Sequence, residues 1–218
     1  NRDGGFPTFS CGWGKLPFDQ SCADLTGHAI LAMAKTVHIL GDSLSKKQYS
    51  SIKRSLVKAL IYLKKQQNPS GYWLPLWFGN QLNADHTNPV YGTARVTAYL
   101  NETLQTPFGN EYSVILKLMI DRGCRYLNSV QNQDGSWGGV KNTPGSMEET
   151  ALAVTALVPN GFQKECTSGM SWLAEKTKSD GIVASPIGLY FASLWYDEEM
   201  YPLTAYLECL STVKETVE

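Results

Sequence analysis

The sequence has no long apolar run and no excess of charge of either sign. Its most apolar stretches, such as residues 151–158, are far shorter than the roughly 20 residues that a membrane-spanning helix needs. The 218 residues carry 19 basic and 20 acidic side chains, whereas nucleic-acid-binding domains usually carry a basic excess or stripe. Hydrophobic residues make up 43% of the chain, which excludes global disorder. We therefore expect a globular protein that binds no nucleic acid.

Cysteine is scarce and follows no metal-binding pattern. The five cysteines are Cys11, Cys22, Cys124, Cys166 and Cys209. Their odd number and their spacing match neither a disulfide framework nor a zinc motif. This usage favours a reducing, cytoplasmic setting, and no basic segment followed by an apolar stretch resembles a signal peptide. We expect no metal and no other cofactor.

One pattern occurs twice with identical spacing: an aromatic–leucine pair, then glutamine, glycine and tryptophan. Its key residues are Gln67, Gly71 and Trp73 in one copy, and Gln131, Gly135 and Trp137 in the other. A third copy, ending at Val183, has lost its glutamine and tryptophan, and residues 1–6 look like the tail of a fourth, so the chain is expected to begin inside a repeat. Glutamine can bond the free groups at a helix end, glycine permits a tight turn, and tryptophan covers the amide. We interpret these residues as structural joints.

Between the joints, apolar residues recur at helical spacing and predict about eight helices and no strand. The predicted helices cover residues 23–40, 52–66, 90–104, 112–130, 146–158, 169–176, 186–196 and 203–213. Proline and glycine mark the breaks, as at residues 107–109 and 159–161. Stacked helix pairs bury one face against their neighbours. The sequence therefore predicts an all-α fold, a closed or solenoidal α/α array, as one domain over residues 1–218.

The joints resemble the QW motifs of class II triterpene cyclases, the squalene–hopene and oxidosqualene cyclase family. Further segments that resemble the family, in the same order, are residues 16–18 with 24–28, 71–79 with 91–93, 131–139 with 149–153, and 186–202. The resemblance covers nearly the whole chain. It implies an α/α barrel (toroid) that is incomplete here, because the match is to the C-terminal part alone.

What the resemblance implies about function is specific. Class II cyclases fold a linear polyprene such as squalene in an apolar cavity and cyclise it by an acid-initiated carbocation cascade. The family's proton donor, an Asp-x-Asp-Asp box, lies upstream of the matched region, and no such box occurs in this sequence. The resemblance thus implies a cavity-forming part of a cyclase, and we expect this chain alone to be inactive.

The resemblance also implies candidate site residues. Asp24 and His28 match a pair that lies beside the family's donor acid and tunes its acidity, and their spacing places them on one helix face. The alternative is that Ser21 and Asp24 form a capping box at a helix start. Aromatic rings stabilise cations, and the aromatic candidates for the cavity wall or its entrance are Phe18, Trp77, Tyr91, Phe191, Trp195 and Tyr196. The last three are expected on the final helix pair.

The sequence also departs from the family pattern. Leu76 stands where the family has arginine, and an insertion at residues 80–88 lengthens the segment before Tyr91. Glu148 and Glu149 follow Ser146 at a helix start, where carboxylates are stabilised by the helix dipole. We interpret the two glutamates as structural.

Two alternatives stay open. A protein prenyltransferase β-type barrel would need a zinc site, and residues 19–22 lack its Asp-x-Cys spacing. A non-catalytic barrel or accessory subunit that binds an isoprenoid would share the joints and lack the acid.

The expected partners follow from the resemblance as well. They are a hydrophobic polyprenyl substrate, the missing N-terminal part of the same protein, a second copy in a homodimer, and the inner face of the cytoplasmic membrane. The membrane expectation depends on the resemblance, because we recognise no basic amphipathic helix in the sequence.

Overall fold

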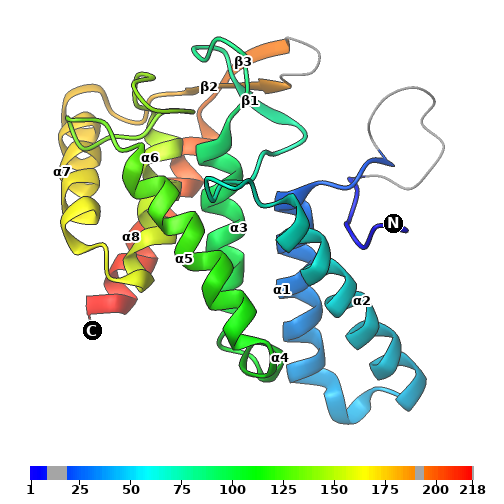
Figure 1. The fold of residues 1–218 in the computed structure, drawn as a ribbon. Helices are drawn as coiled ribbons and strands as arrows, with labels where there is room; N and C mark the ends of the chain where they lie inside the picture. Colours follow the sequence, from blue (N-terminus) through cyan, green and yellow to red (C-terminus); the bar gives the residue numbers. More distant parts are fainter. Residues whose placement is uncertain (9–18, 190–193, 218) are drawn as a thin grey trace.

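The structure is a computed structural model and describes residues 1–8, 19–189 and 194–217. Helices dominate the described residues (Figure 1). The α-helices are α1 (Ala23–Leu40), α2 (Lys46–Gln66), α3 (Pro89–Thr103), α4 (Pro107–Glu111), α5 (Ser113–Ser129), α6 (Met147–Leu157), α7 (Gln163–Asp180) and α8 (Met200–Val217). The strands are β1 (Phe78–Asn80), β2 (Ser185–Leu189) and β3 (Leu194–Glu198).

The long helices form two layers. α1, α3, α6 and α8 pack side by side in that order and make the first layer, while α2, α5 and α7 pack on α1, α3 and α6 respectively and make the second (Figure 1). Every residue of α6 is buried, because α3, α5, α7 and α8 all pack against it. The predicted all-α architecture of paired helices is confirmed.

Seven of the eight predicted helices are present among the described residues, with some different ends. α2 begins at Lys46 and not at Ile52 because Ser45 and Gln48 form a capping box, in which the Gln48 N–H donates to Ser45 Oγ at 3.3 Å. α7 begins at Gln163, six residues before the prediction. The single-turn helix α4 was not predicted, because its proline and glycine are typical of a loop between two helices.

The expectation of no strand is wrong, and so is the predicted helix over residues 186–196. This segment contributes β2 and β3, which pair antiparallel with Gly188 opposite Trp195 and Ile187 opposite Tyr196. β2 also pairs antiparallel with β1, with Gly79 opposite Gly188. The segment is rich in aromatic residues, which fit a pleated surface, and its β1 partner lies over 100 residues earlier, where a local pattern cannot reveal it.

The joints connect consecutive helix pairs through backbone groups. Gln67 Nε2 donates to the carbonyl of Gly71 in its own turn and to the carbonyl of Met119 in α5, both at 2.9 Å. Gln131 Nε2 makes the equivalent bonds to Gly135 (2.9 Å) and to Glu165 in α7 (3.0 Å). Each glutamine therefore ties the end of one second-layer helix to the next helix of that layer.

The tryptophans complete the joints from within the core. Trp73 and Trp137 are fully buried, and their indole N–H groups donate to the carbonyls of Leu63 (2.9 Å) and Leu127 (2.8 Å), ten residues earlier. A Cβ on Gly123 of α5 would lie 3.2 Å from the Trp73 ring. The absence of a side chain at Gly123 therefore lets α5 approach the preceding joint closely.

The N-terminal segment has the geometry of a third joint. Gly4 has φ +94°, as Gly71 (+102°) and Gly135 (+91°) do, and a Cβ on it would lie 2.5 Å from the Lys58 carbonyl of α2. The Phe6 N–H donates to Thr26 Oγ1 at 2.9 Å. The backbone N–H groups of Trp73 and Trp137 make the same bond to the threonines of their next first-layer helices. The interpretation of residues 1–6 as the tail of a repeat agrees with these contacts.

Candidate functional site

Asp24 lies in the first turn of α1 and is buried. The Cys22 thiol donates a hydrogen bond to its carboxylate, and the Leu76 N–H donates to the same sulfur at 3.2 Å. Burial raises the pKa of the Asp24 carboxyl above its usual range. The capping-box alternative is wrong, because the N-cap residue is Cys22 and the Ser21 hydroxyl donates to Asp3 at 2.8 Å. Asp24 is thus held by the cysteine before its helix and, through it, by the loop after Trp73.

His28 lies one turn further along α1 and is exposed. Its ring stacks on Tyr99 of α3, with centroids 5.2 Å apart and an angle of 17° between the rings. The structure therefore places Asp24 in the interior and His28 on the surface of the first layer. That Asp24 and His28 together tune the acidity of a proton-donating carboxyl group stays a prediction.

Three residues of α3 lie one turn apart on a single helix face: Tyr91, Arg95 and Tyr99. The Arg95 guanidinium carbon lies 5.9 Å from the centroids of both tyrosine rings, within the range of cation–π contact. Burial raises the pKa of Tyr91, and the Arg95 charge opposes that shift. The arginine is thus held between two aromatic faces of its own helix.

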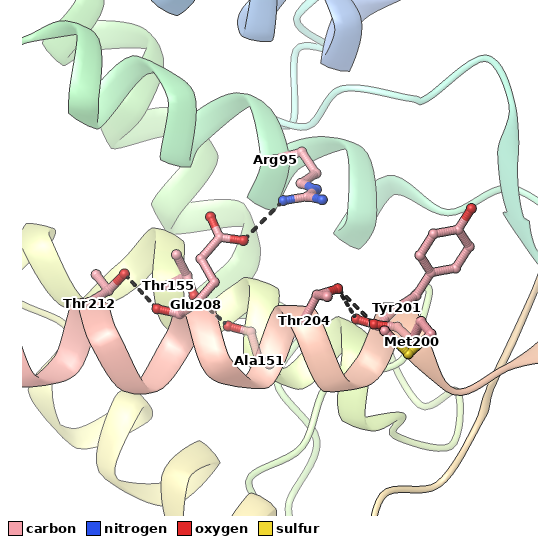
Figure 2. Close-up of polar contacts among 8 residues, drawn as sticks. All are labelled: Arg95, Ala151, Thr155, Met200, Tyr201, Thr204, Glu208 and Thr212. Atoms are coloured by element: carbon pink, nitrogen blue, oxygen red, sulfur yellow. Dashed lines mark hydrogen bonds and ion pairs between the residues drawn. The ribbon is translucent and has the colours of Figure 1, made fainter.

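Arg95 also joins α3 to α8. Its Nη1 lies 3.2 Å from Glu208 Oε2, and Figure 2 shows this pair bridging the two helices. The hydroxyls of Thr155, Thr204 and Thr212 in the same view donate to carbonyls of their own helices. In these bonds the threonine hydroxyls do not use the Glu208 carboxylate as acceptor, and that carboxylate pairs with Arg95.

The aromatic part of the site spans the sheet and α8. The ring centroid of Phe78 in β1 lies 5.0 Å from that of Tyr91 and 6.0 Å from that of Tyr201. The Phe78 and Tyr201 rings meet edge to face. Tyr201 is the second residue of α8 and is 39% exposed. Burial, and next the neighbouring Tyr201, raises the pKa of Tyr196 to about 12. The strands thus bring aromatic side chains to the same end of the first layer as the α3 face.

Two buried glutamates begin α6. Glu149 accepts hydrogen bonds from Asn80 Nδ2 (2.7 Å) and Asn88 Nδ2 (2.8 Å) and contacts the Ser146 hydroxyl. These bonds fix both ends of the inserted loop over residues 80–88. Burial, and next the Glu149 carboxylate, raises the pKa of Glu148 to about 8, while Arg95 opposes the shift.

We call these residues the first-layer cluster. Its members are Asp24, His28, Phe78, Tyr91, Arg95, Tyr99, Glu148, Tyr201 and Glu208. They come from α1, α3, α6, α8 and β1. A cavity of about 650 Å³ opens beside Glu208, between α3 and α8, and is lined also by Asn101, Glu102 and Glu215. This cavity is more polar than the apolar hollow that the resemblance implies.

The other predicted site residues lie in different surroundings. Trp77 is buried, at 8% exposure, directly before β1. Tyr196 is exposed on β3, and Trp195 lies on the same strand opposite Gly188. Their expected place on a final helix pair is corrected to this hairpin. Phe18 and Phe191 lie outside the described residues.

Sequence reasoning missed Phe78, Arg95, Tyr99, Tyr201 and Glu208. For Arg95 and Tyr99 a signal was available, because they lie four and eight residues after the predicted Tyr91 on the same helix face. Glu208 and Tyr201 could not be found in this way, since their partners lie on elements far away in the sequence. Among the described residues, no group of three or more histidine, cysteine, aspartate or glutamate side chains is arranged to hold a metal ion.

Comparison with known proteins decides the family. The family described as squalene-hopene cyclase C-terminal domain matches residues 13–188. The chain belongs to this family. Its curated relatives include enfumafungin synthase of Hormonema carpetanum, 30% identical over 63% of this chain and 10% of that protein. They also include squalene–hopene cyclase of Zymomonas mobilis, 26% identical over 78% of this chain and 27% of that protein.

Solved structures agree on the fold of this cyclase C-terminal domain. ent-Copalyl diphosphate synthase from Streptomyces platensis superposes with a TM-score of 0.68 over 98% of this chain and 36% of that chain, at 21% identity. The chain thus spans between a tenth and about a third of the length of these relatives. It corresponds to a C-terminal part of class II terpene cyclases. No helix among the described residues is long and apolar enough to cross a membrane.

Proposed function

We propose that this chain supplies one wall of the reaction cavity of a class II terpene cyclase, in which a linear polyprene is cyclised by an acid-initiated carbocation cascade. The observation that carries the proposal is the first-layer cluster, which gathers aromatic rings and a buried carboxyl on adjacent helices of a domain with the family's fold. Relatives are named for both triterpene and diphosphate products, so the polyprene class is left to experiment.

The aromatic rings of the first-layer cluster could stabilise a carbocation. The rings of Phe78 and Tyr201 offer electron-rich surfaces, which stabilise a desolvated cation by about 2 kcal/mol or more. Arg95 carries a positive charge that would oppose a nearby carbocation, but Glu208 balances it at 3.2 Å. The cluster can therefore present aromatic faces without a net positive charge.

We propose Asp24 and His28 as positioning residues for the acid. Asp24 is held by Cys22 inside the first layer, and its raised pKa favours the protonated, hydrogen-bond-donating form. In the longer protein, Asp24→Asn and His28→Phe are expected to shift the pH profile of cyclisation while the fold is kept. Phenylalanine retains the stacking on Tyr99, so an unchanged pH profile for His28→Phe would show that the imidazole has no part in it.

The activity itself is tested on the longest natural form of the protein. Incubation with squalene or with a linear prenyl diphosphate, followed by mass spectrometry, should give a cyclic product from one of them. The 218-residue chain alone should give none, because it contains no Asp-x-Asp-Asp box. Tight binding of a polyprene by the long form without any cyclic product would favour the non-catalytic, isoprenoid-binding alternative.

A further inference from the structure

The second-layer helix α2 carries an unusual concentration of positive charge. It contains seven basic side chains and no acidic one: Lys46, Lys47, Lys53, Arg54, Lys58, Lys64 and Lys65. The rest of the chain carries 12 basic and 20 acidic side chains. Five of the seven lie within the helix predicted over residues 52–66, so the expectation that the sequence contains no basic amphipathic helix is wrong.

Four of these cations form a straight stripe on the outward face. Lys47, Arg54, Lys58 and Lys65 are spaced by seven, four and seven residues, which places them on one side of a helix. All four are exposed, and the stripe is about 27 Å long at 1.5 Å per residue. Lys53 is paired with Glu111 at 2.8 Å. Among the described residues, no acidic side chain lies within ion-pair distance of the other six.

One apolar side chain lies between the cations on the same face. Ile61 is three residues after Lys58 and four before Lys65, and it is 46% exposed. A shallow apolar depression lies among Tyr49, Lys53, Val57 and Lys58. The opposite face packs on α1 through buried residues such as Leu56 and Leu63. The apolar face of α2 is therefore used inside the fold, and the outward face presents a row of cations with one exposed apolar group, Ile61. Clustered lysine and arginine side chains attract an anionic lipid surface.

The position of α2 in the molecule favours a flat, anionic partner. α2 lies at one end of the fold, and α7 and α8 lie at the other (Figure 1). Residues 131–218, which include α7 and α8, carry twelve acidic and five basic side chains. This separation of charge would turn α2 toward an anionic surface and the acidic end away from it. The phosphates of a nucleic acid would satisfy the cations but offer nothing to Ile61.

We propose that the outward face of α2 binds the anionic lipid headgroups of a membrane surface. The proposal rests on the charges and exposure of α2 and not on the proposed reaction, so lipid binding can be tested without an enzyme assay. It gives the expected membrane contact a specific location in the chain. Each lysine or arginine near an anionic bilayer strengthens binding by about fivefold.

The test is sedimentation of the 218-residue chain with vesicles. Binding is expected to vesicles of phosphatidylcholine with 30% phosphatidylserine, to be absent with phosphatidylcholine alone, and to disappear at 0.5 M NaCl. The variant with Lys47, Arg54, Lys58 and Lys65 all changed to Gln should bind at least about 100-fold more weakly. Ile61→Ser should weaken binding several-fold without altering its salt dependence.

A matched control removes the same charge elsewhere. Lys117, Lys141, Lys164 and Lys178 are exposed on other elements, and changing all four to Gln should leave vesicle binding nearly intact. Equal losses in both variants, or equal binding to neutral vesicles, would overturn the proposal. So would a homodimer, or duplex DNA binding without vesicle binding, that depends on the α2 cations. Circular dichroism of each variant verifies that it is folded.

Discussion

Glu148 shows how a single buried residue couples this fold to pH. The pKa of its carboxyl is raised from 4.5 to about 8, first by burial and then by the Glu149 carboxylate. Between these two pH values the folded state keeps a proton that the unfolded chain has released. The free energy of unfolding is therefore expected to fall as the pH rises from about 4.5 to about 8.

Glu148→Gln should remove much of this dependence. The variant is expected to lose less stability than the unchanged chain between pH 5 and pH 8, and to be the more stable of the two at pH 8. Urea unfolding at several pH values measures both quantities. Glu175→Gln, an exposed change on α7, is the control and should follow the unchanged chain. A Glu148→Gln curve as steep as that of the unchanged chain would show that Glu148 does not hold the proton.

Gly71 is a second residue whose environment can be tested directly. It has φ +102°, and an added Cβ would lie 2.3 Å from the Arg122 carbonyl of α5. Gly161 also has a positive φ of +81°, with nothing within 4 Å of an added Cβ. Gly161→Ala should therefore cost about 1–2 kcal/mol, the strain of the left-handed conformation alone. Gly71→Ala should cost several kcal/mol more, and equal losses in urea unfolding would contradict the close approach.

At the scale of elements, the fold is held together where one helix pair meets the next. Gln67 and Gln131 donate to carbonyls of two different segments each, and the buried tryptophans beside them bond back to the preceding helix. These contacts recur with the same geometry because the sequence repeats with the same spacing. The joints thus set the position of every second-layer helix relative to the next.

Gln67→Met should destabilise the chain by about 1–3 kcal/mol, because it leaves the carbonyls of Gly71 and Met119 without their side-chain donor. Gln131 is less buried than Gln67, so Gln131→Met should cost somewhat less. Gln133→Met, at an exposed position two residues away, should change stability by no more than about 0.5 kcal/mol. Chemical denaturation of the three variants ranks them, and a ranking with Gln133→Met as the most costly would contradict the joint.

The elements also show what the sequence could and could not predict. Helical periodicity and recurring joints sufficed to predict the seven long helices among the described residues, because both signals are local. The hairpin of β2 and β3 was missed because its pairing with β1 depends on residues 78–80, far away along the chain. The same limit applies to the site: Tyr91 was predicted, but its neighbours Phe78 and Tyr201 approach it only through that sheet and α8.

At the scale of the whole molecule, the two layers carry different groups. The first layer carries the aromatic and charged cluster that would face a substrate, and the second layer carries the joints and the basic face of α2. The solved ent-copalyl diphosphate synthase, of which this chain covers 36%, shares its fold. Under the proposed function, the first layer would line the reaction cavity and the second layer would lie on its outer side.

Photoaffinity labelling of the long form with a benzophenone-bearing polyprene analogue, followed by peptide mapping, tests this assignment most directly. We expect the label on first-layer peptides that contain Phe78, Tyr91 or Tyr201, and we expect excess unlabelled polyprene to suppress it. Tyr91→Ala should reduce labelling of its own peptide and of the α8 peptide. Label confined to α2, α5 and α7, or labelling that competitor does not suppress, would contradict the account.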